Sequence, residues 1–259
     1  VHVCHLPHYG LDVHPNAVAN VARTMWETDR LPERSAAWCT QVDEVWVPKE
    51  QNVALYVDAG VPAERVVVVP TAIDERRYGH ERPPSRIAGT SGFVFLSLFF
   101  WSPRKGWDVL VRAFVEEFAP HEDVTLVIAG NASDQRSAAR RMQEVADLIR
   151  HRLGRSPASC PRIIHLPVID ATPEEIAQLH SAADAFVLAT RGERAGLPIL
   201  EAMASGVPVI VPRDCVSYVA DDRAFLVDTE WVDVPPEVWP ILPFFAVALL
   251  VLLMQAFAI

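Results

Sequence analysis

Cysteine is scarce in this sequence. The four cysteines are Cys4, Cys39, Cys160 and Cys215, spread over 259 positions. None stands in a Cys-x-x-Cys pair, the spacing from which zinc sites and redox motifs are commonly built. The pattern therefore predicts neither a zinc site nor a disulfide framework, and it fits a protein kept in a reducing compartment.

Positive charge is also in short supply. The chain has 23 Lys and Arg against 33 Asp and Glu, a formal net charge of −10 and an isoelectric point of about 5.3. Proteins that bind nucleic acid generally need a basic face, so this balance disfavours a nucleic-acid partner. The arginine-rich segment 134–152 is accordingly predicted to be a helix with a solvated outer face.

The sequence begins without an initiator methionine and without the charged-then-apolar pattern of a signal peptide. Because the sequence starts at Val1 as if from the interior of a protein, we expect the chain to be a fragment of a longer protein. At 259 residues it can bury a substantial core, in one large domain or two small ones.

Four histidines and a cysteine gather in the first fifteen residues: His2, Cys4, His5, His8 and His14. One interpretation is a metal cluster, although the spacings match no standard zinc pattern. The other, which we favour, places these side chains on an irregular loop. No metal site is predicted.

Residues 185–212 organise the rest of the chain, and they have the pattern strand, loop, helix, strand. The apolar run 185–190 is typical of a strand buried on both faces of a parallel sheet. The polar run 191–196 predicts a loop at the carboxyl end of that strand. Pro198 stands where helices begin and Gly206 where they end, before a second buried strand.

Two carboxylates occupy this segment, Glu193 on the loop and Glu201 on the helix. In an open α/β sheet, ligands bind outside the carboxyl ends of the strands. A helix start there offers free backbone N–H groups and the positive end of a dipole, which suit a phosphate. The segment therefore predicts a ligand site.

The run Arg-Gly-Glu-x-x-Gly-Leu-Pro-x-x-Glu-Ala-Met-Ala-x-Gly-x-Pro-Val-Ile, residues 191–210, resembles the signature of the retaining glycosyltransferases of family 4, also called glycosyl transferases group 1. That family has the two-domain GT-B fold. The resemblance implies that Glu193 lies beside the donor sugar as a catalytic residue and that Glu201 binds the ribose hydroxyls. It also implies a place in the nucleotide-sugar site for three neighbours: Gly196, Leu197 and Pro198.

One departure from the family pattern follows Glu193. The family usually has glycine and then a bulky residue, whereas this chain has Arg194 and Ala195. Glycine at such a position often permits a positive φ or a close approach of the backbone to a ligand. An arginine there could crowd the donor or pair with Glu193.

A second part of the site is predicted before the helix over residues 107–118. Arg104 and Lys105 precede that helix, where two cations beside free N–H groups can clamp a diphosphate. The family uses the lysine of a Lys-Gly pair, which Lys105 matches, and an arginine some six residues earlier, where this chain has Phe99. We expect Arg104 to take that role; the alternative is a solvated Arg-Lys turn. Gly130 ends the next buried strand and faces the same cleft.

The strand and helix pattern predicts an α/β protein, GT-B-like, with a Rossmann-like parallel-sheet C-terminal domain preceded by a partial N-terminal domain. The expected boundaries are 1–75 for the partial, acceptor-side N-terminal domain, 76–92 for a linker and 93–232 for the nucleotide-sugar-binding domain. Within the first part, residues 16–27 have a weak helical pattern, and residues 42–48 and 66–69 are predicted strands.

Residues 233–259 form an apolar tail, uncharged from residue 238 onward. The nineteen residues 241–259 would span roughly 28 Å as a helix, about one hydrocarbon core. One interpretation is a membrane helix; the other is a terminus that has lost the family's usual end. The expected location is cytoplasmic, or membrane-associated and facing the cytoplasm.

The predicted function is a retaining glycosyltransferase that moves a sugar from a UDP- or GDP-linked donor to a glycan, lipid or protein acceptor. No Asp-x-Asp motif is present, so neither a metal nor another cofactor is expected. The alternative is a truncated or inactive module that binds a nucleotide sugar without turnover. An epimerase or phosphorylase on the same fold fits the Glu-Ala-Met-Ala block less well.

Overall fold

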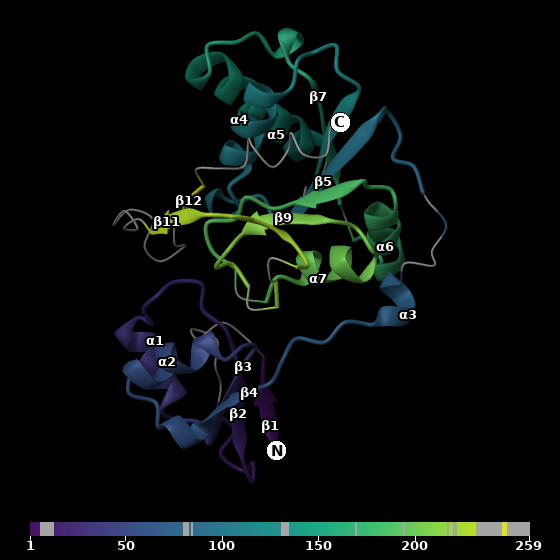
Figure 1. Cartoon of the computed structure of the whole chain (residues 1–259). Helices are drawn as coiled ribbons and strands as arrows, with labels where there is room; N and C mark the ends of the chain where they lie inside the picture. Colours follow the sequence, from purple (N-terminus) through teal and green to yellow (C-terminus); the bar gives the residue numbers. More distant parts are fainter. Residues whose placement is uncertain are drawn as a thin grey trace.

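A computed structural model describes residues 1–5, 13–79, 83, 85–130, 135–168, 170–193, 195–216, 218–219, 222–231 and 245–247. His8 and Arg194 lie outside this part of the chain. The described residues form two α/β units, an N-terminal one and a larger C-terminal one, joined by an extended segment that runs from β4 to α3 (Figure 1).

The N-terminal unit is a small parallel sheet. Its strands follow one another in the order β1-β2-β3-β4. They are β1 (His2–Cys4), β2 (Asn20–Arg23), β3 (Glu44–Val47) and β4 (Val66–Val68), with the helices α1 (Glu33–Cys39) and α2 (Gln51–Asp58). Tyr56 of α2 and Val45 of β3 are fully buried in the core of this unit. The strands predicted at 42–48 and 66–69 are thereby confirmed.

The helix predicted over residues 16–27 is wrong, because strand β2 (Asn20–Arg23) lies at the centre of that range instead. Val21 pairs with Val3 on one side and with Glu44 on the other, so β2 is an inner strand of the sheet. A short apolar run suits a buried strand as well as a helix, and only the pairing with distant strands decides between them.

The C-terminal unit is a six-stranded parallel sheet in the order β10-β9-β8-β5-β6-β7. Its strands are β5 (Phe93–Phe99), β6 (Val124–Gly130), β7 (Arg162–Pro167), β8 (Ala185–Val187), β9 (Val209–Pro212) and β10 (Phe225–Val227). This is the strand order of the doubly wound Rossmann fold. β6 and β7 follow β5 on one side of it, and β8, β9 and β10 are added on its other side, so the strand order reverses between β5 and β8. The predicted Rossmann-like parallel sheet is confirmed.

Helices cover both faces of this sheet. Phe95 of β5 contacts Phe114 of α4 (Trp107–Glu117), with the ring centroids 6.1 Å apart. Leu96 points to the opposite face, because successive side chains alternate. Leu96 is paired with Phe186 of β8, whose ring lies 5.5 Å from His180 of α6 (Pro173–Ser181).

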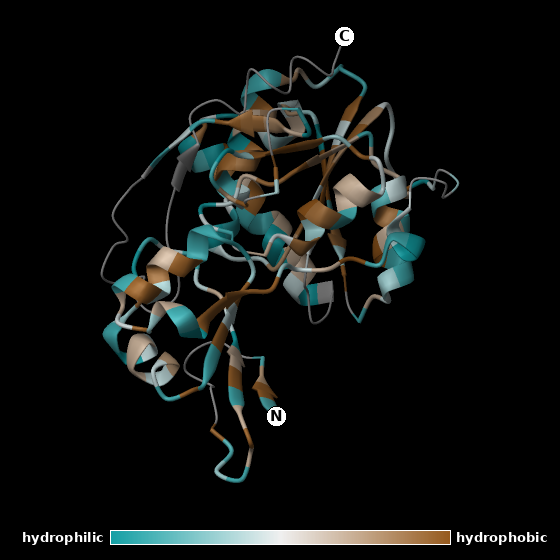
Figure 2. Cartoon of the chain, turned by 60° about the horizontal axis from the view of Figure 1, so that its bottom comes forward, coloured by the Kyte–Doolittle hydropathy of each residue, from teal (hydrophilic) through white to brown (hydrophobic). Residues whose placement is uncertain are grey.

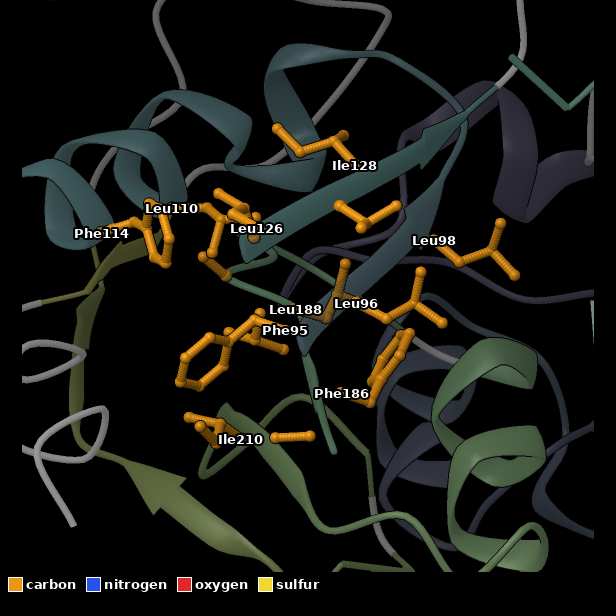
Figure 3. Packing of buried hydrophobic residues seen from close by; sticks show 14 of the residues in the cluster. Phe95, Leu96, Leu98, Leu110, Phe114, Leu126, Ile128, Phe186, Leu188 and Ile210 are labelled. Carbon is orange, nitrogen blue, oxygen red and sulfur yellow. The ribbon is translucent and has the colours of Figure 1, made fainter. Parts of the chain in front are cut away.

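The sheet is apolar on both faces, as its strand sequences predict. Most of the strand ribbon in the larger unit has the colour of hydrophobic residues (Figure 2). Figure 3 shows Leu110 and Phe114 of α4 beside Leu126, and Phe186 beside Leu96. All five side chains are fully buried. Burial of this kind, worth roughly 1.5–3 kcal/mol for each such side chain, makes the sheet a rigid platform for the loops at its carboxyl edge.

The remaining helices of the larger unit are α5 (Gln135–Asp147), continued by a π-helical turn (Leu148–Arg152), and α7 (Leu197–Ala204). A capping box begins α6, since the Thr172 hydroxyl and the Glu175 carboxylate each accept from the other's backbone N–H. The short helix α3 (Glu75–Tyr78) crosses the predicted boundary between the N-terminal domain and the linker, and Tyr78 is buried.

The membrane helix predicted over 241–259 finds no support. Phe245–Val247 forms strand β12, antiparallel to β11 (Thr229–Trp231), and the other residues of that range lie outside the described part. Among the helices in the described ranges, none is both long and apolar enough to cross a bilayer.

Candidate functional site

Two loops meet at the carboxyl edge of the larger sheet, where the strand order reverses. One is the turn Pro103–Lys105, which follows β5, and the other is residues 190–193, which follow β8. The Arg191 backbone N–H donates to the Arg104 carbonyl oxygen at 2.7 Å. The edges beside a reversal of strand order are where doubly wound sheets bind ligands, and the predicted site lies at this one.

Gly106 permits the close approach of the two loops. Its φ is +65°, and a Cβ atom built on it would lie 1.8 Å from the Ala189 carbonyl oxygen. Any side chain at this position would therefore push the start of α4 away from β8. The glycine of the Lys-Gly pair thus holds Lys105 against the loop that carries Glu193.

Glu193 is the centre of a buried charge cluster. Its carboxylate forms a short ion pair with the Lys105 ammonium and lies 3.6 Å from Nη1 of Arg104. It also accepts from the Gly196 backbone N–H at 3.4 Å. Burial opposes ionisation of Glu193, but Lys105 and Arg104 outweigh it and hold the pKa of the carboxyl below its usual value. The structure therefore brings the three predicted catalytic residues together.

Arg104 has further partners. Its Nη1 donates to the Gly192 carbonyl oxygen at 2.7 Å and lies 3.6 Å from the Glu27 carboxylate of the N-terminal unit. Only 17% of the Arg104 side chain is exposed, so it is not the solvated turn residue of the alternative interpretation. Phe99, at the position of the family's arginine, is buried in the core.

Arg191 ties the two loops together, and the sequence analysis missed it. Its guanidinium forms a two-pronged ion pair with Asp108, each N–O distance being 2.6 Å, and donates to the Pro103 carbonyl oxygen at 2.6 Å. Paired bonds of this geometry are among the strongest polar contacts in proteins. Asp108 and Arg191 are 83 positions apart, and no spacing in the sequence signals the contact.

The residues around the start of α7 lie beside this cluster. Gly196 caps the helix with φ +61°, and Leu197 and Pro198 form its first turn, as predicted. The Tyr218 hydroxyl lies 2.7 Å from the Gly196 carbonyl oxygen, and a Cβ atom on Gly196 would come within 2.5 Å of that hydroxyl. Burial raises the pKa of Tyr218, and Cys215, Glu193 and Glu201 raise it further. Both predicted glutamates therefore lie within electrostatic range of this tyrosine, which the sequence did not single out.

Glu201 lies between α3 and α6. Its carboxylate is 3.4 Å from Nε2 of the fully buried His180 and accepts a hydrogen bond from Tyr78. Burial and Glu201 together raise the pKa of the Tyr78 hydroxyl. Neighbours on two helices therefore hold the Glu201 carboxylate in place. Because 15% of its side chain is exposed, the carboxylate still reaches the surface.

Gly130 is placed at the end of β6, between Phe99 of β5 and Pro167 of β7. A Cβ atom on it would lie 3.0 Å from the Phe99 carbonyl oxygen. It therefore shares the carboxyl edge of the sheet with the charge cluster, and its role in binding stays a prediction.

The charge cluster offers cations to an anionic ligand and carboxylate oxygens to hydroxyl groups. A small recess opens beside the loop and is lined by Thr190, Gly192, Pro212, Asp214, Cys215 and Thr229. Burial raises the pKa of the Cys215 thiol to about 12, and Lys49 of the N-terminal unit opposes that rise. In the part of the chain that the structure describes, no three His, Cys, Asp or Glu side chains are grouped to hold a metal ion.

Comparisons with known proteins find relatives of the C-terminal unit, which contains this site. The profile of the family described as Glycosyl transferases group 1 matches residues 90–233. The D-inositol 3-phosphate glycosyltransferase of Acidothermus cellulolyticus is 30% identical over 66% of this chain and 38% of its own length. The mannosylfructose-phosphate synthase of Agrobacterium fabrum is 26% identical over 61% of this chain and 34% of its own length.

Solved structures agree on the fold. The structure of HepE from Anabaena in complex with UDP and glucose is similar with a TM-score of 0.54 and 23% identity, covering 69% of this chain and 47% of that one. The likeness supports a GT-B-like fold with a Rossmann-like C-terminal domain. The chain spans about a third of the length of the curated relatives named above.

Proposed function

This chain belongs to the family of glycosyl transferases group 1, and from that premise we propose that it forms the donor-binding part of a glycosyltransferase. The reaction moves a sugar from a nucleotide diphosphate to an acceptor and retains the configuration of the sugar. The observation that carries the proposal is the cluster of Glu193, Lys105 and Arg104 at the reversal of strand order.

The two cations suit the departing diphosphate. As the bond between sugar and phosphate breaks, negative charge grows on the diphosphate oxygens, and positive groups already in place stabilise it. Lys105 and Arg104 stand before the start of α4, whose free N–H groups add to the same field. In this proposal the cations supply the charge that a bound metal supplies in other transferases.

The two glutamates suit the two ends of the donor. Glu193, held by Lys105 and by the Gly196 N–H, orients the donor sugar. Glu201 accepts hydrogen bonds from the ribose hydroxyls, a role for which an ionised carboxylate with two acceptor oxygens is suited. Tyr78 and His180 position Glu201 for this task.

The test is calorimetric titration of the whole chain with UDP, GDP and their sugar conjugates. We expect saturable binding of one nucleotide class, lost in Lys105→Ala and weakened at least about tenfold in Glu201→Ala, since each removes a charge-assisted contact. The matched controls are Arg112→Ala and Glu116→Ala, exposed residues of α4, which should bind like the parent chain. A folded chain that binds no nucleotide would overturn the proposal.

A second candidate, binding without turnover, is favoured by the fact that both cations already have carboxylate partners. The two functions differ in one measurement. Release of free UDP or GDP from a nucleotide sugar, with or without an acceptor present, shows turnover. Tight binding without release assigns the chain to the second function.

A further inference from the structure

We propose that helix α3, in the segment that joins the two units, makes the donor site selective for ribonucleotides over deoxyribonucleotides, because its Tyr78 holds the Glu201 carboxylate in place. The inference rests on the proposed function, in which Glu201 accepts hydrogen bonds from the ribose hydroxyls. It goes further in two ways. It names the class of donor, a sugar linked to a ribonucleotide, and it makes the connecting segment a functional part of the site.

Helix α3 packs on the larger unit, although the sequence places it at the end of the N-terminal part. It lies against α6 and α7 (Figure 1). Its Tyr78 is buried, and the ring meets the His180 ring of α6 edge-on, with the centroids 6.3 Å apart. The ion pair of Arg77 with Glu174, at 3.4 Å, is exposed on both sides, and exposed pairs contribute little. Burial of the Tyr78 ring therefore fastens α3 to the helices around Glu201.

Two neighbours from different helices hold the Glu201 carboxylate. The Tyr78 hydroxyl donates to it from α3. From α6, Nε2 of the fully buried His180 lies 3.4 Å from Oε2 of Glu201. A ring nitrogen that faces a carboxylate is favourable as an N–H donor, so this contact assigns a proton to Nε2. A glutamate side chain otherwise samples several rotamers, and contacts from two sides confine it to one.

The confined carboxylate keeps acceptor sites for a ligand. An ionised carboxylate has about four lone-pair sites, and the bonds from Tyr78 and His180 leave the others available. Because 15% of the Glu201 side chain is exposed, these sites can be reached from solvent. A ribose presents two adjacent hydroxyl donors, at C2′ and C3′, to such a group. Charge-assisted hydrogen bonds of this kind are strong when the acceptor is already oriented.

Confinement turns this match into selectivity. A 2′-deoxyribose lacks one donor, and a carboxylate that cannot turn away is then left with an unpaired, partly buried acceptor. Sites built to hydrogen-bond a hydroxyl reject analogues without it for this reason. If the Tyr78 hydroxyl is removed, Glu201 is free to turn toward water in the deoxyribose complex, and the penalty shrinks. Discrimination between the two sugars therefore depends on Tyr78.

The experiment measures selectivity as the ratio of Kd for the 2′-deoxy nucleotide to Kd for UDP or GDP, by calorimetric titration of the whole chain. We expect a ratio of at least about ten in the parent chain for the base that binds. Glu201→Ala should bring the ratio close to about one, and Tyr78→Phe, which removes only the hydroxyl, should lower it at least about threefold. The matched control is Tyr56→Phe, which removes the hydroxyl of a fully buried tyrosine in the N-terminal unit and should keep the ratio of the parent. Thermal unfolding verifies that the variants are folded.

Each outcome is decisive. A ratio that falls in Tyr78→Phe and stays unchanged in Tyr56→Phe supports the inference. A parent chain that selects ribose, beside a Tyr78→Phe variant with the same ratio, overturns it and leaves the proposed function standing. An equal fall in Tyr56→Phe overturns it too, because the loss would then reflect a general loosening of the fold.

Two results would reach further. Equal binding of ribose and deoxyribose nucleotides by the parent chain overturns the inference and the ribose role of Glu201, while nucleotide binding by the cations stands. Absence of nucleotide binding in every folded variant overturns the proposed function itself, and the inference with it.

Discussion

At the scale of single residues, Glu193 stabilises the fold as well as the site. We expect Glu193→Gln to lower the free energy of unfolding by about 2–4 kcal/mol at pH 7, since it leaves the buried Lys105 ammonium without its counter-charge. Urea unfolding measures the change. The control is Glu116→Gln on the exposed face of α4, which should cost less than about 0.5 kcal/mol. Equal costs in the two variants would contradict the prediction.

The contribution of Glu193 depends on pH in a defined direction. Its pKa in the folded chain lies below the ordinary value of 4.5, so the unfolded state takes up a proton first as the pH falls. The stabilisation is complete above the ordinary value and is lost as the pH drops through the lower, folded pKa. The difference in unfolding free energy between the parent chain and Glu193→Gln should therefore shrink below about pH 4.5. A difference that grows on acidification would refute this assignment.

Gly106 is a second residue with a specific requirement. Alanine there combines a positive φ with a Cβ atom 1.8 Å from the Ala189 carbonyl oxygen, so Gly106→Ala should cost more than about 3 kcal/mol and abolish nucleotide binding. Gly154 has a similar φ of +63° with nothing within 4 Å of its Cβ position. Gly154→Ala should therefore cost only about 1 kcal/mol and leave binding unchanged. Melting temperatures and nucleotide titration of both variants test the contrast.

At the scale of elements, the Arg191–Asp108 ion pair holds the loop 190–193 against the turn 103–105 and so decides the shape of the site. Arg191 and Asp108 should show a coupling energy of about 1–3 kcal/mol in a double-mutant cycle of Arg191→Ala and Asp108→Ala. Arg191→Lys should recover little of it, because an ammonium cannot span both carboxylate oxygens. The same variants should weaken nucleotide binding, since the loop that carries Glu193 is loosened. Additive effects of the two alanines would contradict the role of the ion pair.

Elements with strong local signals were predicted correctly from the sequence. Strand β8, helix α7 and strand β9 are the clearest cases, because short apolar runs and the helix ends at Pro198 and Gly206 specify them locally. The segment with β2 was assigned wrongly, because its four residues become a strand only by pairing with β1 and β3. Short elements stabilised by distant partners carry too little local information.

At the scale of the whole molecule, the two units have separate cores of unequal size. The larger core surrounds β5 and β6, whereas the smaller one is built around β3 and α2. Because less apolar surface holds the smaller unit together, it should open more readily. In hydrogen exchange, amides of β2 and β3 should exchange at least about tenfold faster than amides of β6. Equal protection of both sheets would show that the units open together.

The sequence by itself determined the fold of the larger unit and singled out most of the residues of its candidate site. Apolar runs, helix ends and the run around Glu193 are local patterns, and local patterns survive without tertiary information. Only the tertiary structure decided which charges meet: Glu193 with Lys105 and Arg104, Arg191 with Asp108, and Arg104 with Glu27. These pairs are brought together by parallel strands whose carboxyl ends share one edge and by a second unit that packs beside it. The spacing of these residues along the chain does not predict which of them lie close together in the fold.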